Sequence, residues 1–326
     1  MTYSDSRGRK RNGGTGGKVA VVGSGLMGRG IGQVFATAGF SVSLIDLNQK
    51  VLDSALQQIS TSLDTLEKSA LLNETKKSIF SRITTTPDLS KGVSDASFVV
   101  EAVFENVEEK KDVFKRIENA TGNSTIIATN TTAIPIATLA GVTARPERVI
   151  GTHFWNPPHL VPAVEVTRGE RTSLDTVEKT VSLLKKVGKK PAIINRDVPG
   201  QIGIRILYAM IREATWLVEN KIASPEDIDN TVKEALGARL EVLGPLELAD
   251  LSGIDLVENV ANILYKSLDS SKTPQPLVKR MVSSGELGVK TGKGFYNWKN
   301  GRNAQTTIRE RDAHLIKILK EQASES

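Results

Sequence analysis

The amino-acid sequence predicts an α/β fold, with a doubly wound and mostly parallel sheet, followed by an all-α C-terminal domain. Short apolar runs alternate with helical segments up to residue 195, which is typical of βαβ units. A glycine-rich turn at residues 23–28 follows the first of these runs. Beyond Asp197–Gly200 the apolar residues recur with a helical period, and almost no strand signal remains. We therefore expect the architecture to change at that segment.

The individual elements follow from the same patterns. The strands are expected at residues 18–22, 41–46, 97–100, 124–128, 149–153, 163–166 and 192–195. The helices of the first half are expected at residues 27–38, 48–82, 107–120 and 172–187. In the second half, one helix face carries Ile202, Ile206, Met210 and Ile211. Ser224 with Pro225 marks a further helix start, and residues 308–321 form one amphipathic helix.

Bulk composition narrows the class of protein. The 326 residues suffice for two domains. No apolar run reaches the length of about eighteen residues that a membrane span needs. The absence of cysteine excludes disulfides, thiolate catalysis and cysteine-metal sites. The formal net charge is +6, and a good part of it lies in the basic tail around Arg7–Arg11. We expect a cytoplasmic protein with no metal site, no nucleic-acid partner and no membrane partner.

These observations divide the chain into three parts. Residues 1–17 are expected to form a disordered basic tail. Residues 18–197 are expected to form a dinucleotide-binding domain of the Rossmann type, and residues 198–326 an all-helical domain. The helices of the second domain carry more apolar faces than one small domain needs to bury. We therefore expect this domain to bind substrate and to form a homodimer.

The turn after the first strand fits the dinucleotide-binding pattern G-x-G-x-x-G. Gly23 makes the tight turn, Gly25 lets the backbone approach a pyrophosphate, and Gly28 lets the helix pack closely on the sheet. The intervening residues Ser24, Leu26 and Met27 complete the predicted cofactor-binding turn. The alternative, a glycine-rich turn without a ligand, is disfavoured by the strand before the motif and the helix after it.

An acidic residue, Asp46, ends the second predicted strand, where it can accept hydrogen bonds from the adenosine ribose. A 2′-phosphate at this place would be repelled by about 3–4 kcal/mol at an effective dielectric constant near 20. Asn48 offers no positive charge to offset this repulsion. The sequence therefore predicts NAD as the cofactor rather than NADP.

His153 is the candidate acid–base residue of the chain. It ends an apolar strand, and the strand ends of an open α/β sheet face the ligand crevice. A histidine can take the proton of an alcohol as hydride leaves, because its pKa lies near neutral pH. Glu165, twelve residues later on the returning strand, is the candidate partner that orients the ring. From spacing alone, a structural role for His153 stays equally open.

The ordered set of motifs resembles the L-3-hydroxyacyl-CoA dehydrogenase family from Lys18 to Trp298. The matching stretches are residues 23–28, 100–105, 129–132, 152–157, 164–166, 197–200, 243–250 and 290–296. The resemblance implies that His153 is the base, that Glu165 is its carboxylate partner, and that Thr132 supplies a hydroxyl near the reacting oxygen. By the same matching, cofactor contacts are expected from Glu105, Lys110, Asn156 and Lys290.

The residues expected to contact the substrate are compatible with more than one substrate class. Ile204 stands where the family usually has an asparagine that helps to hold the substrate. A 3-hydroxyacyl-CoA is the leading prediction, with Ser62 and Lys68 as the expected coenzyme A contacts. The alternative is a small hydroxy acid of the gulonate, carnitine or pyridine-carboxylate type, whose carboxylate Arg239 can bind. A second alternative is a non-catalytic NAD-binding protein with a structural or regulatory role.

Overall fold

The computed structural model describes residues 16–324. The predicted basic tail therefore lies outside the described residues, except for Gly16 and Gly17, which belong to the first strand. Two compact units are present. The first holds the chain up to Ile202 together with the residues from Asp312 onward, and the second holds Gly203–Arg311.

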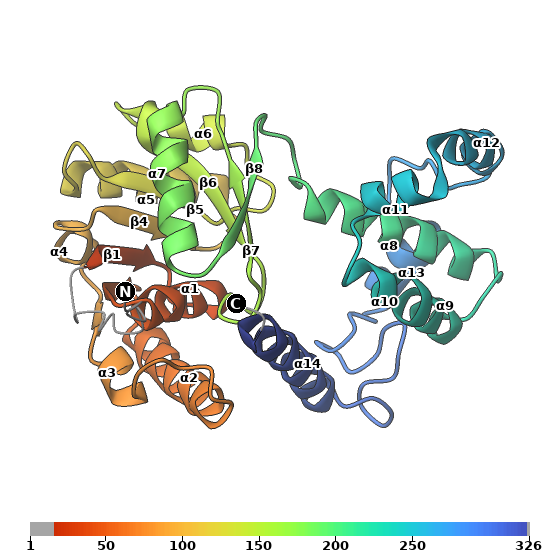
Figure 1. The fold of residues 1–326 in the computed structure, drawn as a ribbon, viewed down its shortest axis with the longest axis horizontal. Helices are drawn as coiled ribbons and strands as arrows, with labels where there is room; N and C mark the ends of the chain where they lie inside the picture. Colours follow the sequence, from red (N-terminus) through yellow and green to blue (C-terminus); the bar gives the residue numbers. More distant parts are fainter. Residues whose placement is uncertain (1–15, 325–326) are drawn as a thin grey trace, which may run out of the picture. The chain divides into compact units, whose positions relative to one another are not determined.

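The first unit is built on one eight-stranded sheet with the strand order β3-β2-β1-β4-β5-β6-β7-β8. Strands β1 and β4 to β8 are labelled in Figure 1. The strands are β1 Gly16–Val22, β2 Phe40–Ile45, β3 Ile83–Thr86, β4 Phe98–Glu101, β5 Ile126–Thr129, β6 Val149–Phe154, β7 Ala163–Thr167 and β8 Lys190–Ile194. Neighbouring strands run parallel except for β6 and β7, which are antiparallel. The predicted α/β class with a mostly parallel sheet is confirmed.

Helices cover both faces of this sheet. The helices of the first unit are α1 Leu26–Thr37, α2 Gln49–Lys68, α3 Lys76–Phe80, α4 Leu89–Val93, α5 Val107–Ala120, α6 Ile136–Ala140 and α7 Leu174–Lys186. A short 3₁₀ turn, Pro146–Arg148, precedes β6. Along β1, Val19 and Val21 join one buried apolar cluster, while Ala20 and Val22 join the other. The alternation of strand side chains therefore fills two cores, which is the doubly wound arrangement.

The helix predicted at residues 48–82 is wrong in extent, because the chain forms two helices there. The first ends at its C-cap, Ser69, and Ala70 takes a positive φ of 57°, which stops a helix. Thr75 caps the next helix by accepting a hydrogen bond from the N–H of Ser78. The strand β3 that follows was not predicted, since only Ile83 of its four residues is buried.

The second unit is helical, as predicted. Its elements are α8 Gly203–Glu219, α9 Pro225–Thr231, the π-helical segment Val232–Gly237, α10 Ala238–Leu240, α11 Pro245–Ser252, α12 Ile254–Leu264 and α13 Pro276–Ser283. The last helix, α14 Ala304–Ser324, crosses the division between the units. Ser224 caps α9 by accepting from the N–H of Asp227. Within residues 16–324, no helix has both the length and the apolar character that a bilayer crossing requires.

Candidate functional site

The glycine-rich turn joins the end of β1 to the start of α1. Gly23 has a φ of +95°, a conformation that glycine adopts readily and other residues do not. Its N–H donates to the carbonyl oxygen of Ile45 over 2.8 Å. A Cβ atom at Gly23 would lie 2.5 Å from the carbonyl oxygen of Ala102. The turn therefore holds the ends of β1, β2 and β4 together, with no room for a side chain at residue 23.

Gly25 and Gly28 have opposite surroundings. A Cβ atom at Gly28 would lie 1.7 Å from the carbonyl oxygen of Gly23, whereas a Cβ atom at Gly25 would meet nothing within 4 Å. Gly25 is the N-cap of α1, and no side chain caps this helix. The first N–H groups of α1 and the positive end of its dipole therefore face open space. This arrangement fits the pyrophosphate of a dinucleotide.

The other residues of the turn have distinct environments. Ser24 is buried, and its hydroxyl donates to the carbonyl oxygen of Ile45 over 3.3 Å. Leu26 and Met27 begin α1; Leu26 is exposed, and Met27 packs against the core. The motif thus forms one ordered turn around the helix N-terminus.

Asp46 follows β2 and closes the turn from the other side. Its Oδ2 atom accepts a hydrogen bond from the N–H of Ser24 at 3.0 Å, and its Oδ1 atom accepts one from the N–H of Asn48 at 3.0 Å. An ionised carboxylate has about four lone-pair sites. The two backbone bonds fix the carboxylate and leave acceptor capacity for the hydroxyls of a ribose.

His153 and Glu165 form a cross-strand pair. They lie directly opposite each other on the antiparallel strands β6 and β7. Nδ1 of His153 lies 2.8 Å from Oε2 of Glu165, and both side chains are buried. The other carboxylate oxygen, Oε1, accepts a hydrogen bond from the N–H of Ile202 over 2.9 Å. The ring of Trp155 packs edge-on against the imidazole, with the centroids 5.2 Å apart.

The contact with Glu165 bears on the tautomer of His153. When Glu165 is ionised, its carboxylate only accepts, so Nδ1 carries the hydrogen and Nε2 has the free lone pair. Nε2 forms no hydrogen bond with any residue in the range 16–324. A buried carboxylate therefore holds the imidazole ring through Nδ1, and Nε2 is left as the nitrogen that can accept a proton near the end of β6.

A buried ion pair lies at the end of β4, where Glu101 is the last residue of the strand. Nζ of Lys110 is 2.7 Å from Oε1 of Glu101, and both side chains are almost completely buried. Burial raises the pKa of Glu101, while the Lys110 ammonium and the hydroxyl of Thr129 oppose that rise. The resemblance implies a cofactor contact for Lys110, but its ammonium group is occupied by Glu101, the carbonyl oxygen of Val103 and the carboxylate of Glu105.

Glu105 organises the loop after β5. Its Oε1 atom accepts hydrogen bonds from the hydroxyl of Thr131 at 2.5 Å and from the N–H groups of Thr132 and Ala133 at 3.0 Å each. Burial would raise the pKa of Glu105, but these hydrogen bonds and the charge of Lys110 together hold it below its usual value. Thr132 is partly exposed, and its hydroxyl makes no hydrogen bond within residues 16–324, so it can bond to a ligand.

Three polar residues of this region were not singled out from the sequence; Glu101 and Gln201 are buried and Asn130 is partly buried. Glu101 anchors Lys110, and Asn130 accepts from the N–H of Phe154 over 2.8 Å. Gln201 donates to the carbonyl oxygen of Thr131 over 3.1 Å. Lys110 shares its helix face with Val113, Phe114 and Ile117, so its burial was readable from the helical period. Asn130 and Gln201 act through non-local bonds that leave no periodic signal.

Asn156 is the second residue of the connection between β6 and β7, and it is exposed. Lys189 holds this connection. Its ammonium group is buried and donates to the carbonyl oxygens of Pro158 at 2.5 Å and Val161 at 2.9 Å. On the other side, a Cβ atom at Gly30 of α1 would lie 2.8 Å from Cδ of Pro158. The connection is thus fixed between α1 and Lys189.

The stability of the fold should depend on pH through Lys189. Burial lowers the pKa of Lys189 from 10.5 to about 8. Between these values the unfolded chain binds the proton and the folded chain releases it, so stability rises with pH through this window. The shift corresponds to about 3 kcal/mol. We expect urea unfolding at about pH 7 and about pH 10 to show the rise in wild type, relative to Lys189→Met. An equal pH dependence in both proteins would contradict the assignment.

The two expected substrate contacts on α2, Ser62 and Lys68, have different surroundings. The hydroxyl of Ser62 accepts from Nε2 of Gln33 over 2.9 Å. Lys68 is exposed at the end of α2. The neighbouring Lys76 pairs with Asp64 over 2.7 Å. Along this helix, Lys68 therefore remains as an exposed positive charge without a cluster around it.

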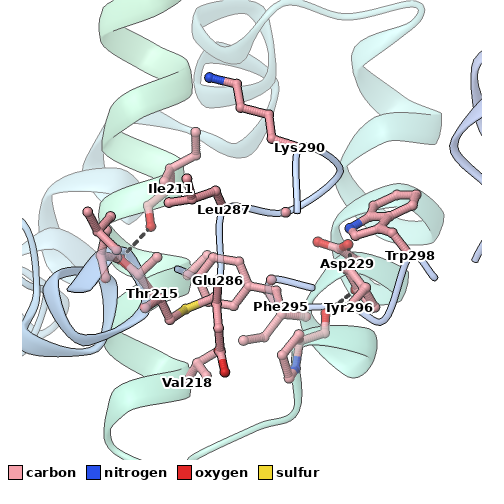
Figure 2. A pocket seen from close by; sticks show the side chains of 18 residues that line it. Ile211, Thr215, Val218, Asp229, Glu286, Leu287, Lys290, Phe295, Tyr296 and Trp298 are labelled. Atoms are coloured by element: carbon pink, nitrogen blue, oxygen red, sulfur yellow. Dashed lines mark hydrogen bonds between the residues drawn. The ribbon is translucent and has the colours of Figure 1, made fainter. Parts of the chain in front are cut away.

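Lys290 and Arg239 lie in the second unit. Lys290 belongs to the lining of an apolar pocket of about 630 Å³ formed by α8, α9, α13 and residues 286–298. Figure 2 shows its ammonium group pointing away from Phe295 and Tyr296. Tyr296 donates to Asp229 over 2.7 Å, and burial with this carboxylate raises its pKa to about 12. Arg239 is exposed on α10, where its Nε donates to the carbonyl oxygen of Ala235 over 2.9 Å.

Comparisons with known proteins bear on both units. The family model described as 3-hydroxyacyl-CoA dehydrogenase, NAD binding domain, matches residues 18–198, and the model of the C-terminal domain of the same enzyme matches residues 200–298. A probable 3-hydroxybutyryl-CoA dehydrogenase of Deinococcus radiodurans is 39% identical over 282 residues, which cover 86% of this chain and 100% of that protein.

A second relative carries a different substrate in its name. The 5-formyl-3-hydroxy-2-methylpyridine 4-carboxylate 5-dehydrogenase of Mesorhizobium japonicum is 34% identical over 278 residues, 85% of this chain and 89% of that protein. A crystal structure of a dehydrogenase for the same pyridine acid, described as an NAD⁺-dependent dismutase, superposes with a TM-score of 0.87 at 32% identity. It covers 93% of this chain and 98% of that one.

Proposed function

Because the chain belongs to the 3-hydroxyacyl-CoA dehydrogenase family, we propose that it oxidises an L-3-hydroxyacyl-CoA to the 3-ketoacyl-CoA with NAD, or catalyses the reverse reaction. Family membership makes it an NAD-dependent oxidoreductase that acts on a CH–OH group. The observation that supports the proposed role of His153 is its buried contact with Glu165, 2.8 Å between Nδ1 and Oε2. This contact leaves Nε2 as the base at the strand end.

NAD, when bound, supplies the hydride acceptor. In the proposed oxidation, Nε2 of His153 takes the hydroxyl proton of the substrate, and Glu165 stabilises the imidazolium that results. The free hydroxyl of Thr132 donates a hydrogen bond to the substrate oxygen and stabilises the charge that develops there. Lys110 acts indirectly in this proposal. Its ammonium group pairs with Glu105, and Glu105 accepts a hydrogen bond from the N–H of Thr132.

The cofactor residues of the proposal are those of the glycine turn together with Asp46, Glu105, Asn156 and Lys290. The turn and Asp46 are supported by the open helix N-terminus at Gly25 and by the fixed carboxylate. Asn156 is exposed and can donate to ribose or carboxamide oxygens. Lys290 is exposed in the second unit and offers a positive charge.

The charge of Asp46 should set the preference for NAD over NADP. The change Asp46→Asn keeps an acceptor for the N–H of Ser24 but removes the negative charge that repels a 2′-phosphate. We expect the ratio of kcat/KM for NAD over NADP to fall by about tenfold or more, chiefly through better use of NADP. Steady-state kinetics with both cofactors would measure the ratio. An unchanged ratio would remove Asp46 from the ribose site.

A small hydroxy acid is the second candidate substrate, and two observations favour it. Ser62 is already bonded to Gln33, and Lys76 is paired with Asp64, so α2 has no cluster of free positive charge for the phosphates of coenzyme A. One relative acts, by its name, on a pyridine carboxylate. Under this alternative, the exposed Arg239 binds the substrate carboxylate.

The two substrate classes can be separated by two parallel assays. Oxidation of NADH would be followed with acetoacetyl-CoA, and in parallel reduction of NAD with hydroxy acids, including the alcohol form of the pyridine carboxylate. Turnover of acetoacetyl-CoA supports the first proposal, and Lys68→Ala should then raise the KM for it. Turnover of a hydroxy acid alone, with loss on Arg239→Ala, would replace the first proposal by the second. NADH binding without turnover of any substrate would support the non-catalytic alternative.

We propose further that residues 198–326 act as the substrate and dimerisation domain. Large apolar side chains are exposed along α11 and α12; they include Leu246 at 80%, Leu251 at 71%, Ile254 at 60% and Ile263 at 73%. A water-exposed apolar area of this kind is typical of an interface. We expect sedimentation to show a homodimer, and Ile263→Glu to weaken it. A monomeric wild-type protein at micromolar concentration would contradict the proposal.

A further inference from the structure

Gln201 has an unusual backbone conformation at the entrance to α8. Its φ is +51°, in the left-handed region that residues other than glycine seldom occupy. The preceding turn already has a glycine for its own positive φ, since Gly200 has +78°. The N–H of Gln201 closes that turn by donating to the carbonyl oxygen of Val198 over 3.1 Å. The turn therefore does not by itself explain why a glutamine takes the next left-handed position.

The side chain of Gln201 is also unusual, because only half of its amide is used. The residue is 4% exposed, and Nε2 donates to the carbonyl oxygen of Thr131 over 3.1 Å. Oε1 is buried and has no hydrogen-bond partner among residues 16–324. Only the NH₂ group can donate to a carbonyl, so the contact with Thr131 fixes which way the amide points.

Both features destabilise the folded chain. A left-handed conformation strains a residue that has a Cβ atom, and a buried acceptor without a donor loses its hydration without compensation. A residue that violates two local rules at once is expected where function requires it. The contacts of Gln201 indicate which function this is.

Gln201 lies between the two halves of the candidate site. Through its side chain it holds the carbonyl of Thr131, the residue before the Thr132 hydroxyl. Through the next residue, Ile202, the same backbone delivers an N–H to Oε1 of Glu165 over 2.9 Å. The other oxygen of Glu165 binds His153.

We propose that Gln201 is a positioning residue of the reaction, which holds the Thr132 hydroxyl and the imidazole of His153 in one fixed frame. The proposal rests on the roles that the proposed function gives to Thr132, His153 and Glu165. Small displacements of reacting groups reduce rates strongly, with about 10²-fold lost for a displacement of 1 Å. The loss of this connection should therefore lower kcat more than it changes the KM for the substrate.

Two substitutions separate the effect of the side-chain amide of Gln201 from the effect of its strained backbone. Gln201→Met keeps the length and burial of the side chain but removes the amide. Gln201→Gly removes the amide and also relieves the strained φ. Lys221→Gly is the matched control, because Lys221 has a similar φ of 56° and is exposed in the second unit.

Five quantities would be measured for each variant. They are kcat and KM on whichever of acetoacetyl-CoA and the hydroxy acids the wild type turns over, the affinity for NADH, the Tm, and the hydrogen-exchange rate of the Ile202 amide. For Gln201→Met and Gln201→Gly we expect kcat to fall by about 10-fold to 100-fold, with little change in KM or NADH affinity. The Tm should change little in Gln201→Met, because the substitution removes the unpartnered Oε1 but also leaves the carbonyl oxygen of Thr131 without its donor. In Gln201→Gly the strained φ is relieved as well, which offsets part of that loss. The Ile202 amide should exchange about tenfold faster or more, because its bond to Glu165 is loosened. Lys221→Gly should change neither kcat nor this exchange rate.

A wild-type kcat in Gln201→Met would overturn the proposal. So would a lower kcat that comes with a lower Tm and an unchanged exchange rate at Ile202, since that result describes a merely structural residue. If the wild type turned over no substrate, the proposed function would fail, and the exchange rate alone would decide whether Gln201 fixes Glu165. An unchanged rate in Gln201→Met would then overturn the role of Gln201 as well.

Discussion

Replacement of His153 by alanine should lower kcat by about 10²-fold to 10⁴-fold, which is the usual contribution of a positioned acid–base group. NADH affinity should be unaffected, because the glycine turn before α1 and Asp46 form the proposed dinucleotide site without His153. The matched control is His314→Ala, since His314 is exposed on α14. Stopped-flow measurement of the hydride step would test the loss, and fluorescence titration would test NADH binding. A fully active His153→Ala enzyme would end the proposed mechanism.

A companion substitution, Glu165→Gln, sharpens this test through the tautomer of the histidine. The N–H of Ile202 is a fixed donor to one oxygen of Glu165, so the oxygen of a glutamine amide must take that place. The NH₂ group then faces Nδ1 of His153 and forces the hydrogen onto Nε2, the atom that should act as the base. We expect a loss of about 10²-fold or more in kcat without loss of the fold. A loss of less than threefold would show that Glu165 does not orient the ring.

The second large effect is expected in the glycine turn. The change Gly28→Ala would place a Cβ atom 1.7 Å from the carbonyl oxygen of Gly23, so α1 or the turn must move. We expect loss of NADH binding together with a drop in Tm of several degrees, because backbone cannot yield as a flexible side chain can.

Gly25→Ala is the matched control for Gly28→Ala. A Cβ atom at Gly25 meets no protein atom within 4 Å, so the fold should be unaffected. Affinity for NADH should nevertheless fall by about tenfold or more, because the methyl group occupies the space that the pyrophosphate needs. Calorimetry and fluorescence titration of both variants would test this contrast. Equal affinity in Gly25→Ala and wild type would place the pyrophosphate elsewhere.

The predicted fold followed from signals that single segments carry. Buried strands such as β4 and β5 are apolar runs, and the glycine turn has a fixed spacing. The strand β3 escaped prediction because three of its four residues are threonines that stay partly exposed. The break between α2 and α3 was missed because an alanine gives no sign in the sequence of the positive φ that Ala70 adopts. Thr75, which caps the next helix, is a residue type that often begins helices and was not used.

The candidate site was predictable to a different degree. The pairing of His153 with Glu165 was expected, since two strands that follow each other often pair. The bonds that hold this pair were not expected. Asn130 and Gln201 are polar residues in loops, and neither periodicity nor spacing distinguishes them from surface residues. Their importance appears only when distant segments are brought together.

The antiparallel pairing of β6 and β7 has a consequence for how this enzyme can diversify. His153 and Glu165 are opposite residues of one ladder, so the hydrogen bonds of the sheet set their separation. The residues between the two strands, 155–162, do not set it. The length and sequence of this connection can therefore differ while His153 and Glu165 keep their separation. An insertion of one residue within either strand would instead turn one partner to the opposite face of the sheet and separate the pair.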